Sequence, residues 1–291
     1  MAQQSFKVGG VSGVSTDLEH FSLADGITLR RTFAHLMSVN LMAFAPAKAG
    51  QPHSTPWKAA KGGFGYDIEI EIIVQRAAAE DLRLTMEDTI WLIAALIRLE
   101  HPYASIPVLS SRSFSLLASS KEEAELTPFE FEIRLFSPAE KPTLSQEDLA
   151  WIKQKLKAVA RMLNTNPSFR AALRALDQAN IHGRNSASLL ATWGALEEIF
   201  SPSRNELRFR VSAYLASYLE DPGEARLNLH KELLKLYDRR SEAAHGAKTA
   251  DITPLVQSFV ILRNAIVKMI DNESIPSHKE LDQMLFCLSN R

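Results

Sequence analysis

Residues 67–74 read Asp67-Ile68-Glu69-Ile70-Glu71-Ile72-Ile73-Val74, with polar and apolar side chains alternating along them. Because successive side chains of a strand point to opposite faces of a sheet, this period of two predicts a half-buried strand. Residues 129–136 alternate in the same way, and residues 105–114 are a weaker strand candidate. The first half of the chain is therefore predicted to be rich in β-structure.

One helix is expected among these strands. It begins at Thr85-Met86-Glu87-Asp88, which resembles a capping box, and it runs to about Glu100, before Pro102. Residues 50–65 are rich in Gly, Pro, Lys and Ser, which is typical of a mobile loop. We therefore predict an α+β domain over residues 1–140, with a sensor or recognition module as its candidate role.

The period changes after two prolines, Pro138 and Pro142, in a polar stretch. Residues 145–148 form a helix cap, and apolar residues follow at helical spacing from Leu149 to Leu163. Further helices are expected over residues 168–180, 186–200, 204–219, 223–244, 252–270 and 278–289. The fold class predicted is an α+β N-terminal domain followed by an all-α helical bundle over residues 141–291.

The composition is that of an ordinary globular protein, with 46% apolar and 23% charged residues. A net charge of −1 gives the 291-residue chain no overall basic field, so nucleic-acid binding would need a local patch or a dimer cleft. Cys287 is the only cysteine, which excludes an intrachain disulfide and suits a reducing cytoplasm.

Neither a membrane span nor a bound cofactor is expected. The most apolar window, residues 90–97, is much shorter than the roughly 20 residues of a spanning helix. Residues 1–10 lack the apolar segment of a signal peptide. The histidines do not have metal-binding spacing, and no glycine-rich phosphate-binding motif is present. We therefore predict a soluble, cytoplasmic protein with no metal site and no cofactor.

The strongest candidates for functional side chains lie in residues 237–246, which read Tyr237-Asp238-Arg239-Arg240-Ser241-Glu242-Ala243-Ala244-His245-Gly246. Arginine forks onto phosphate oxygens, and histidine exchanges protons near neutral pH. Arg240 and His245 are five residues apart, so a helix would separate them by roughly 140° and about 7.5 Å along its axis. They could approach one phosphodiester from different directions.

This stretch and two earlier segments resemble the Apea-like branch of the HEPN superfamily. Residues 189–200 contain Trp193-Gly194-Ala195-Leu196-Glu197, matching a W-x-x-L-E helix, and residues 206–215 contain the arginine helix that follows. The resemblance covers roughly residues 187–269. It implies a small helical bundle that pairs as a homodimer. Many such domains are metal-independent endoribonucleases of bacterial toxins or antiphage defence, with an R-x4–6-H motif from each copy lining one cleft.

Carried onto this chain, the resemblance implies that Arg240, Ser241 and His245 are catalytic. Arg240 would hold the scissile phosphate, and His245 would act on the ribose 2′-OH or the leaving group. The products would be 2′,3′-cyclic phosphate and 5′-OH ends. We also predict that Arg239, Arg208 and Lys248 contact the substrate and that Glu197 and Tyr237 support the site. The expected partners are RNA, a second copy of the chain and a protein regulator.

Several alternatives remain open. Serine at position 241 departs from the Asn, Asp or His more usual in catalytic members, although it is usual in the Apea-like branch. The domain would then be a non-catalytic dimeric module that binds RNA, a nucleotide or a protein, or a regulatory partner of a separate effector. Arg240 would then form an ion pair with Glu197 or Glu242. Trp193 and Tyr237 are expected in core or dimer packing.

Overall fold

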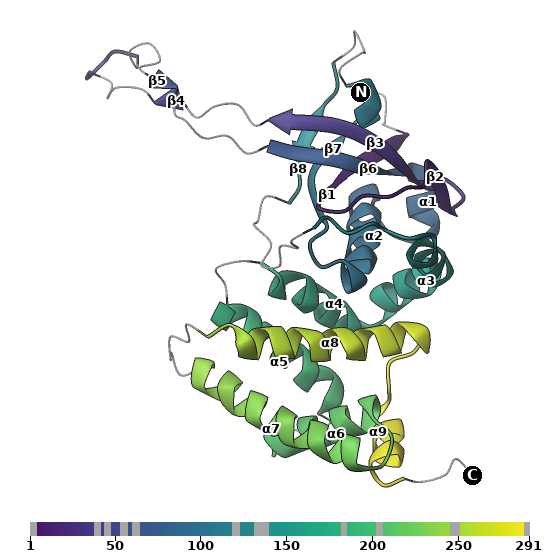
Figure 1. The fold of residues 1–291 in the computed structure, drawn as a ribbon, viewed down its shortest axis with the longest axis vertical. Coiled ribbons are helices and arrows are strands. Elements are labelled where there is room, and N and C mark those ends of the chain that lie inside the picture. Colours follow the sequence, from purple (N-terminus) through teal and green to yellow (C-terminus); the bar gives the residue numbers. More distant parts are fainter. Residues whose placement is uncertain are drawn as a thin grey trace.

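The computed structural model describes residues 5–37, 42–43, 48–52, 58–59, 65–117, 123–130, 140–181, 185–201, 206–244 and 251–287. A β-sheet lies at one end of the elongated molecule and the helices are stacked beneath it (Figure 1). An antiparallel sheet followed by a helical region confirms the predicted fold class.

The main sheet has six antiparallel strands in the order β2-β3-β6-β1-β7-β8. A separate pair, β4 and β5, lies apart from this sheet (Figure 1). The strand bounds are β1 Phe6–Ser12, β2 His20–Ala24, β3 Ile27–Met37, β4 Met42–Ala43, β5 Lys58–Ala59, β6 Gly65–Gln75, β7 Ser105–Ser110 and β8 Leu126–Pro128.

Two glycines of β1 let other elements pack closely on both faces of the sheet. A Cβ atom at Gly9 would lie 2.5 Å from a methyl of Ile90, and one at Gly10 would lie 2.7 Å from the ring of Phe114. Ile90 belongs to the helix α2, and Phe114 begins the 3-10 turn η1 (Phe114–Leu116). The predicted strand over residues 105–114 therefore ends at Ser110, because Phe114 turns back to cover the sheet.

Strand β6 follows the predicted alternation, with one exception. Ile70, Ile72 and Val74 are fully buried, as the period of two predicts. Glu71, on a position expected to face water, is fully buried as well. Its carboxylate accepts hydrogen bonds from Arg30 Nε at 2.7 Å and from the Phe114 backbone N–H at 2.8 Å. These donors offset the cost of removing the charge from water.

The helices form successive layers beneath the sheet, with α2 and α3 nearest to it, then α4, α5 and α8, and finally α6, α7 and α9 (Figure 1). Their bounds are α1 Arg76–Asp81, α2 Met86–Glu100, α3 Gln146–Thr165, α4 Pro167–Ala179, α5 Asn185–Phe200, α6 Leu207–Leu219, α7 Glu224–Ala244, α8 Thr253–Asp271 and α9 His278–Leu285. Buried apolar residues from β1 to α9 form one contiguous cluster, so the sheet and the helices share a core.

The helix caps agree with the sequence analysis. Ser145 and Asp148 form a reciprocal capping box at the start of α3, and the Thr85 hydroxyl accepts from the Asp88 backbone N–H at the start of α2. Helix α6 begins later than predicted, at Leu207, because Glu206 has a left-handed backbone (φ 55°). Helix α9 is shorter than predicted and ends at Leu285.

Some predicted segments lie outside the described residues. They include most of the predicted strand over 129–136, of which only residues 129 and 130 are described, and most of the loop over 50–65. Conversely, β1, β2, β3 and α1 were not predicted from the pattern of the sequence.

Arg98, on α2, joins the sheet to the helices through a buried charge cluster. Its side chain is 5% exposed. Its guanidinium pairs with Glu130, which follows β8, at 2.9 Å and with Asp177 of α4 at 2.7 Å. Glu130 also accepts from the Ile106 backbone N–H of β7, and Asp177 accepts from the Trp91 indole. Three separate parts of the chain therefore meet at one arginine.

Helix α8 is, among the described helices, the one long and apolar enough to cross a membrane. More than half of its apolar window is buried inside the protein, and it packs against α4 and α5. These contacts are those of the core helix of a soluble fold.

We predict that Arg98→Met lowers the free energy of unfolding by about 3 to 5 kcal/mol, because it leaves the carboxylates of Glu130 and Asp177 without their shared cation. Urea denaturation followed by circular dichroism measures this loss. The matched control is Arg31→Met, which breaks an exposed pair with Glu19 and should cost about 1 kcal/mol at most. Equal losses in the two variants would contradict the role assigned to Arg98.

Candidate functional site

The predicted catalytic arginine lies on the inward-facing stripe of α7. Leu233, Leu236 and Tyr237 are buried, and Arg240 follows at the same helical spacing with its side chain 25% exposed. Asp238 and Arg239 are exposed on the opposite side of the helix. The helical period therefore places Arg240 against the neighbouring helix α5.

An aromatic contact holds α5 and α7 together at this point. Trp193 of α5 is fully buried and meets the Tyr237 ring edge to face, with 5.3 Å between the ring centroids. The Trp193 indole N–H donates to the Ser258 hydroxyl of α8 at 3.0 Å. Both rings thus pack inside the bundle, and the buried indole has the polar partner that it needs.

Arg240 and Glu197 form an ion pair beside these rings. One Nη of Arg240 lies 3.0 Å from a Glu197 oxygen, and the Glu197 side chain is 18% exposed. The guanidinium carbon lies 5.4 Å from the centroid of the Tyr237 ring, within cation–π range. Burial, followed by the Glu197 carboxylate, raises the pKa of the Tyr237 hydroxyl above its usual value. The ion pair with Glu197 also holds the Arg240 guanidinium beside the Tyr237 ring.

The other two arginines of the predicted site lie on the outer surface. Arg208 of α6 binds both oxygens of Asp238, with Nε–O and Nη–O distances of 2.7 and 2.8 Å. Hydrogen bonds from this guanidinium lower the pKa of the Asp238 carboxyl. Arg239 pairs with Glu242 one turn along α7, at 3.0 Å. Each of the three arginines therefore has a carboxylate partner.

The remaining predicted residues are placed only in part. Ser241 is half-buried in the last described turn of α7, next to Arg240. His245 and Lys248 lie outside the described residues, as does Gly246. The structure therefore brings Glu197, Tyr237 and Arg240 together and places Arg208 and Arg239 outside that contact.

Two residues of this region have partners that could not be identified from the sequence. Asp238, quoted as part of the motif, holds Arg208 from 30 positions away, and Ser258 holds Trp193 from 65 positions away. Separations of 30 and 65 residues are far longer than those between neighbouring side chains of one helix or strand. Only the packing of α6 on α7 and of α5 on α8 brings these residues together.

The arrangement suits the binding of an anion better than that of a cation. Arg240 has five N–H donors, and its Nε has no hydrogen-bond partner among the described residues. The Nε atom is buried, so a phosphate would have to bind through the Nη donors. Within the same residues, no group of three His, Cys, Asp or Glu side chains is placed to hold a metal ion.

Comparison with known proteins adds no family to this description, since no family model, curated protein or solved structure matches the chain.

We predict that Glu197→Gln lowers the pKa of Tyr237 while leaving it above the ordinary value of about 10, since burial is the larger cause of the shift. Because the pKa of Tyr237 is higher in the folded than in the unfolded state, this hydroxyl stabilises the fold at pH values below its unfolded-state pKa. The stabilisation is lost as the pH rises through the folded-state pKa. NMR titration of ring-labelled tyrosine measures the pKa of Tyr237, and the Tyr237→Phe variant assigns its signal. A pKa unchanged by the substitution would show that Glu197 does not act on this hydroxyl.

Proposed function

We propose that the chain is a metal-independent endoribonuclease of HEPN type that acts as a cytoplasmic homodimer in a bacterial toxin or antiphage system. It would cleave RNA to 2′,3′-cyclic phosphate and 5′-OH ends. Two features support the cellular setting: the core-helix character of α8 and a single free cysteine, Cys287, which suits a reducing compartment.

The observation that carries this proposal is the setting of Arg240. A guanidinium at the end of α7 is held by Glu197 and lies over Tyr237. A side chain whose orientation is already fixed loses less conformational freedom when it binds a phosphate. Pre-organised donors aimed at developing charge are the main source of transition-state stabilisation in many enzymes.

The proposed reaction assigns one task to each motif residue. His245 removes the proton of the ribose 2′-OH, whose oxygen attacks the adjacent phosphorus, and the partner's copy of this histidine protonates the departing 5′-oxygen. Arg240 binds the phosphate oxygens as negative charge accumulates on them. Ser241 donates to the phosphate or orients a histidine.

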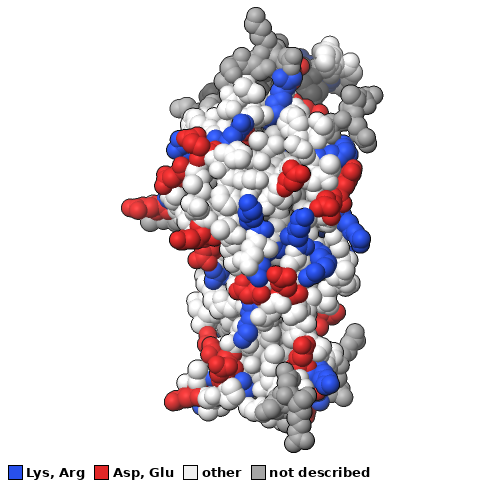
Figure 2. All heavy atoms as spheres, turned by 90° about the vertical axis from the view of Figure 1, so that its right-hand side faces the viewer, with Lys and Arg blue, Asp and Glu red and all other residues white. Residues whose placement is uncertain are grey.

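A second function is favoured by a different observation. Arg240, Arg208 and Arg239 are each neutralised by a carboxylate, so a phosphate must compete with Glu197, Asp238 or Glu242. On the face drawn in Figure 2, which is the side away from the end of α7, charges of both signs are interspersed. These features suit a non-catalytic dimeric module that binds RNA, a nucleotide or a protein regulator.

The test is cleavage of tRNA and mRNA by the purified protein in EDTA, with analysis of the product ends. We expect His245→Ala to slow cleavage by about 10²- to 10⁴-fold, because a general acid or base is lost. Arg240→Lys should slow it by about 10²- to 10³-fold, because lysine keeps the charge but loses the planar fork.

The matched control is Arg161→Lys, the same change at an exposed arginine of α3 outside the proposed site, and it should cleave at close to the wild-type rate. RNA cut equally well by wild type and His245→Ala would overturn the proposal. RNA bound but left intact, with binding weakened by Arg240→Lys, would instead select the non-catalytic module.

A further inference from the structure

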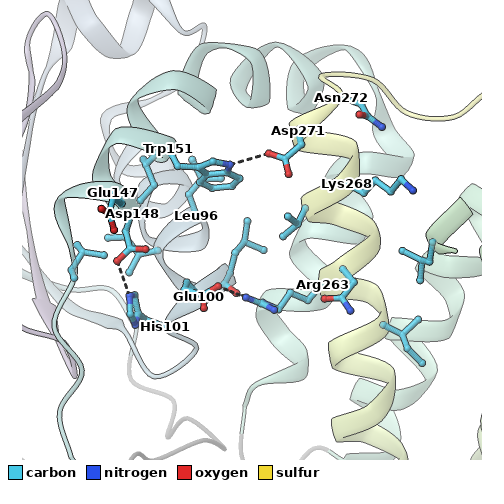
Figure 3. Close-up of a pocket in the computed structure, with 18 of the residues that line it drawn as sticks. Leu96, Glu100, His101, Glu147, Asp148, Trp151, Arg263, Lys268, Asp271 and Asn272 are labelled. Carbon is cyan, nitrogen blue, oxygen red and sulfur yellow. Dashed lines mark hydrogen bonds and ion pairs between the residues drawn. The ribbon is translucent and has the colours of Figure 1, made fainter. Parts of the chain in front are cut away.

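A cavity of about 820 Å³ lies between α2 and α3 on one side and α8 on the other, with the ends of α6 and α7 closing it. Figure 3 shows the Trp151 indole reaching from α3 toward Asp271 of α8 across one end of this cavity. At the other end, Glu100 of α2 pairs with Arg263 of α8. None of the residues assigned to the proposed active site lines it.

The walls of the cavity are mainly apolar. They include Leu96 of α2, Ile152 of α3, Leu229 of α7, and Ile261 and Val267 of α8. Sites for small molecules typically measure about 300 to 1,000 Å³ and combine apolar walls with a few polar groups. The size and lining of this cavity are therefore those of a ligand site.

The charges around the cavity are predominantly negative. Five carboxylates line it (Glu100, Glu147, Asp148, Glu220 and Asp271), against two permanent cations, Arg263 and Lys268. Both cations are already engaged within the protein. Arg263 binds the Leu99 carbonyl and Glu100, while Lys268 donates to the Tyr218 carbonyl at 2.6 Å and lies over the Tyr218 ring.

The carboxylates are not all engaged in this way. Asp271 accepts from the Trp151 indole, and Asp148 accepts from Ser145 and contacts His101. Glu147 and Glu220 are exposed and have no ion-pair partner among the described residues. An incoming cation would therefore meet two uncompensated carboxylates, one at the start of α3 and the other just after α6.

We propose that this cavity binds a small organic cation with an apolar body, such as an aryl-alkyl amine. Its apolar part would lie against the leucine and isoleucine walls, and the net negative charge of the lining, which includes Glu147 and Glu220, would attract its ammonium group. The half-buried ring of Trp151 adds an aromatic face of the kind that attracts organic cations. An anionic ligand would meet net repulsion from the same carboxylates.

The experiment compares three probes with the same apolar body on the full chain by isothermal titration calorimetry: 4-phenylbutylamine, 4-phenylbutanol and 4-phenylbutanoate. We expect the amine to bind more tightly than the carboxylate by about tenfold or more, with the alcohol between them. Glu147→Gln and Glu220→Gln should each weaken amine binding by about two- to fivefold and leave the alcohol unchanged.

Two further variants locate the binding. Val267→Trp fills the cavity from α8 and should abolish binding of all three probes, with folding checked by circular dichroism. Glu19→Gln, a carboxylate of the sheet region outside the cavity lining, is the charge-matched control and should bind the amine as wild type does. Equal affinity for amine and carboxylate, no measurable amine binding, or unchanged binding by Val267→Trp would each overturn the proposal. Because the readout is direct binding, its outcome is independent of whether the protein cleaves RNA.

Discussion

A buried guanidinium sets the main constraint on this fold. Removing an arginine from water costs several kcal/mol unless carboxylates and carbonyls meet it in the interior. Arg98 is met by Glu130 beside the sheet and by Asp177 of α4, so α2 cannot move away from either without exposing an unpaired charge. Helix α2 in turn covers β1 through the close contact at Gly9, and α3 packs on it. The cavity between α2, α3 and α8 exists because these helices are held at this position.

The candidate site also contains an arginine that is paired with a carboxylate, but this pair is less buried than the one at Arg98. Arg240 and Glu197 are each about one-fifth to one-quarter exposed, so water screens their pairing more than that of Arg98. The Trp193–Tyr237 contact beneath them is fully packed and provides the rigid support. A packed aromatic base below a partly exposed ion pair is consistent with the proposed binding of phosphate by Arg240.

Regular elements could be predicted from the sequence where the signal was local. The alternation of residues 67–74 and the caps at Thr85 and Ser145 are patterns of neighbours, and all three were confirmed. Strand β1 was missed because Gly9 and Gly10 have no side chains to alternate, although their role is to admit Ile90 and Phe114. The burial of Glu71, the cluster around Arg98 and the cavity all depend on residues far apart in the chain. A single sequence carries no signal for such pairings. The proposed function rests on a local motif, and its histidine lies outside the described residues.

The shared core has a consequence for how the chain is made. The face of α2 that carries Arg98 and the cavity wall is covered by α3, α4 and α8, which are synthesised later than the sheet. During translation α2 therefore emerges with an apolar face whose partners are complete only after residue 271 has been synthesised. Such contacts between distant parts of the chain slow folding. The two halves are thus not interchangeable modules, and the nascent N-terminal half is an expected client of chaperones that shield apolar surface.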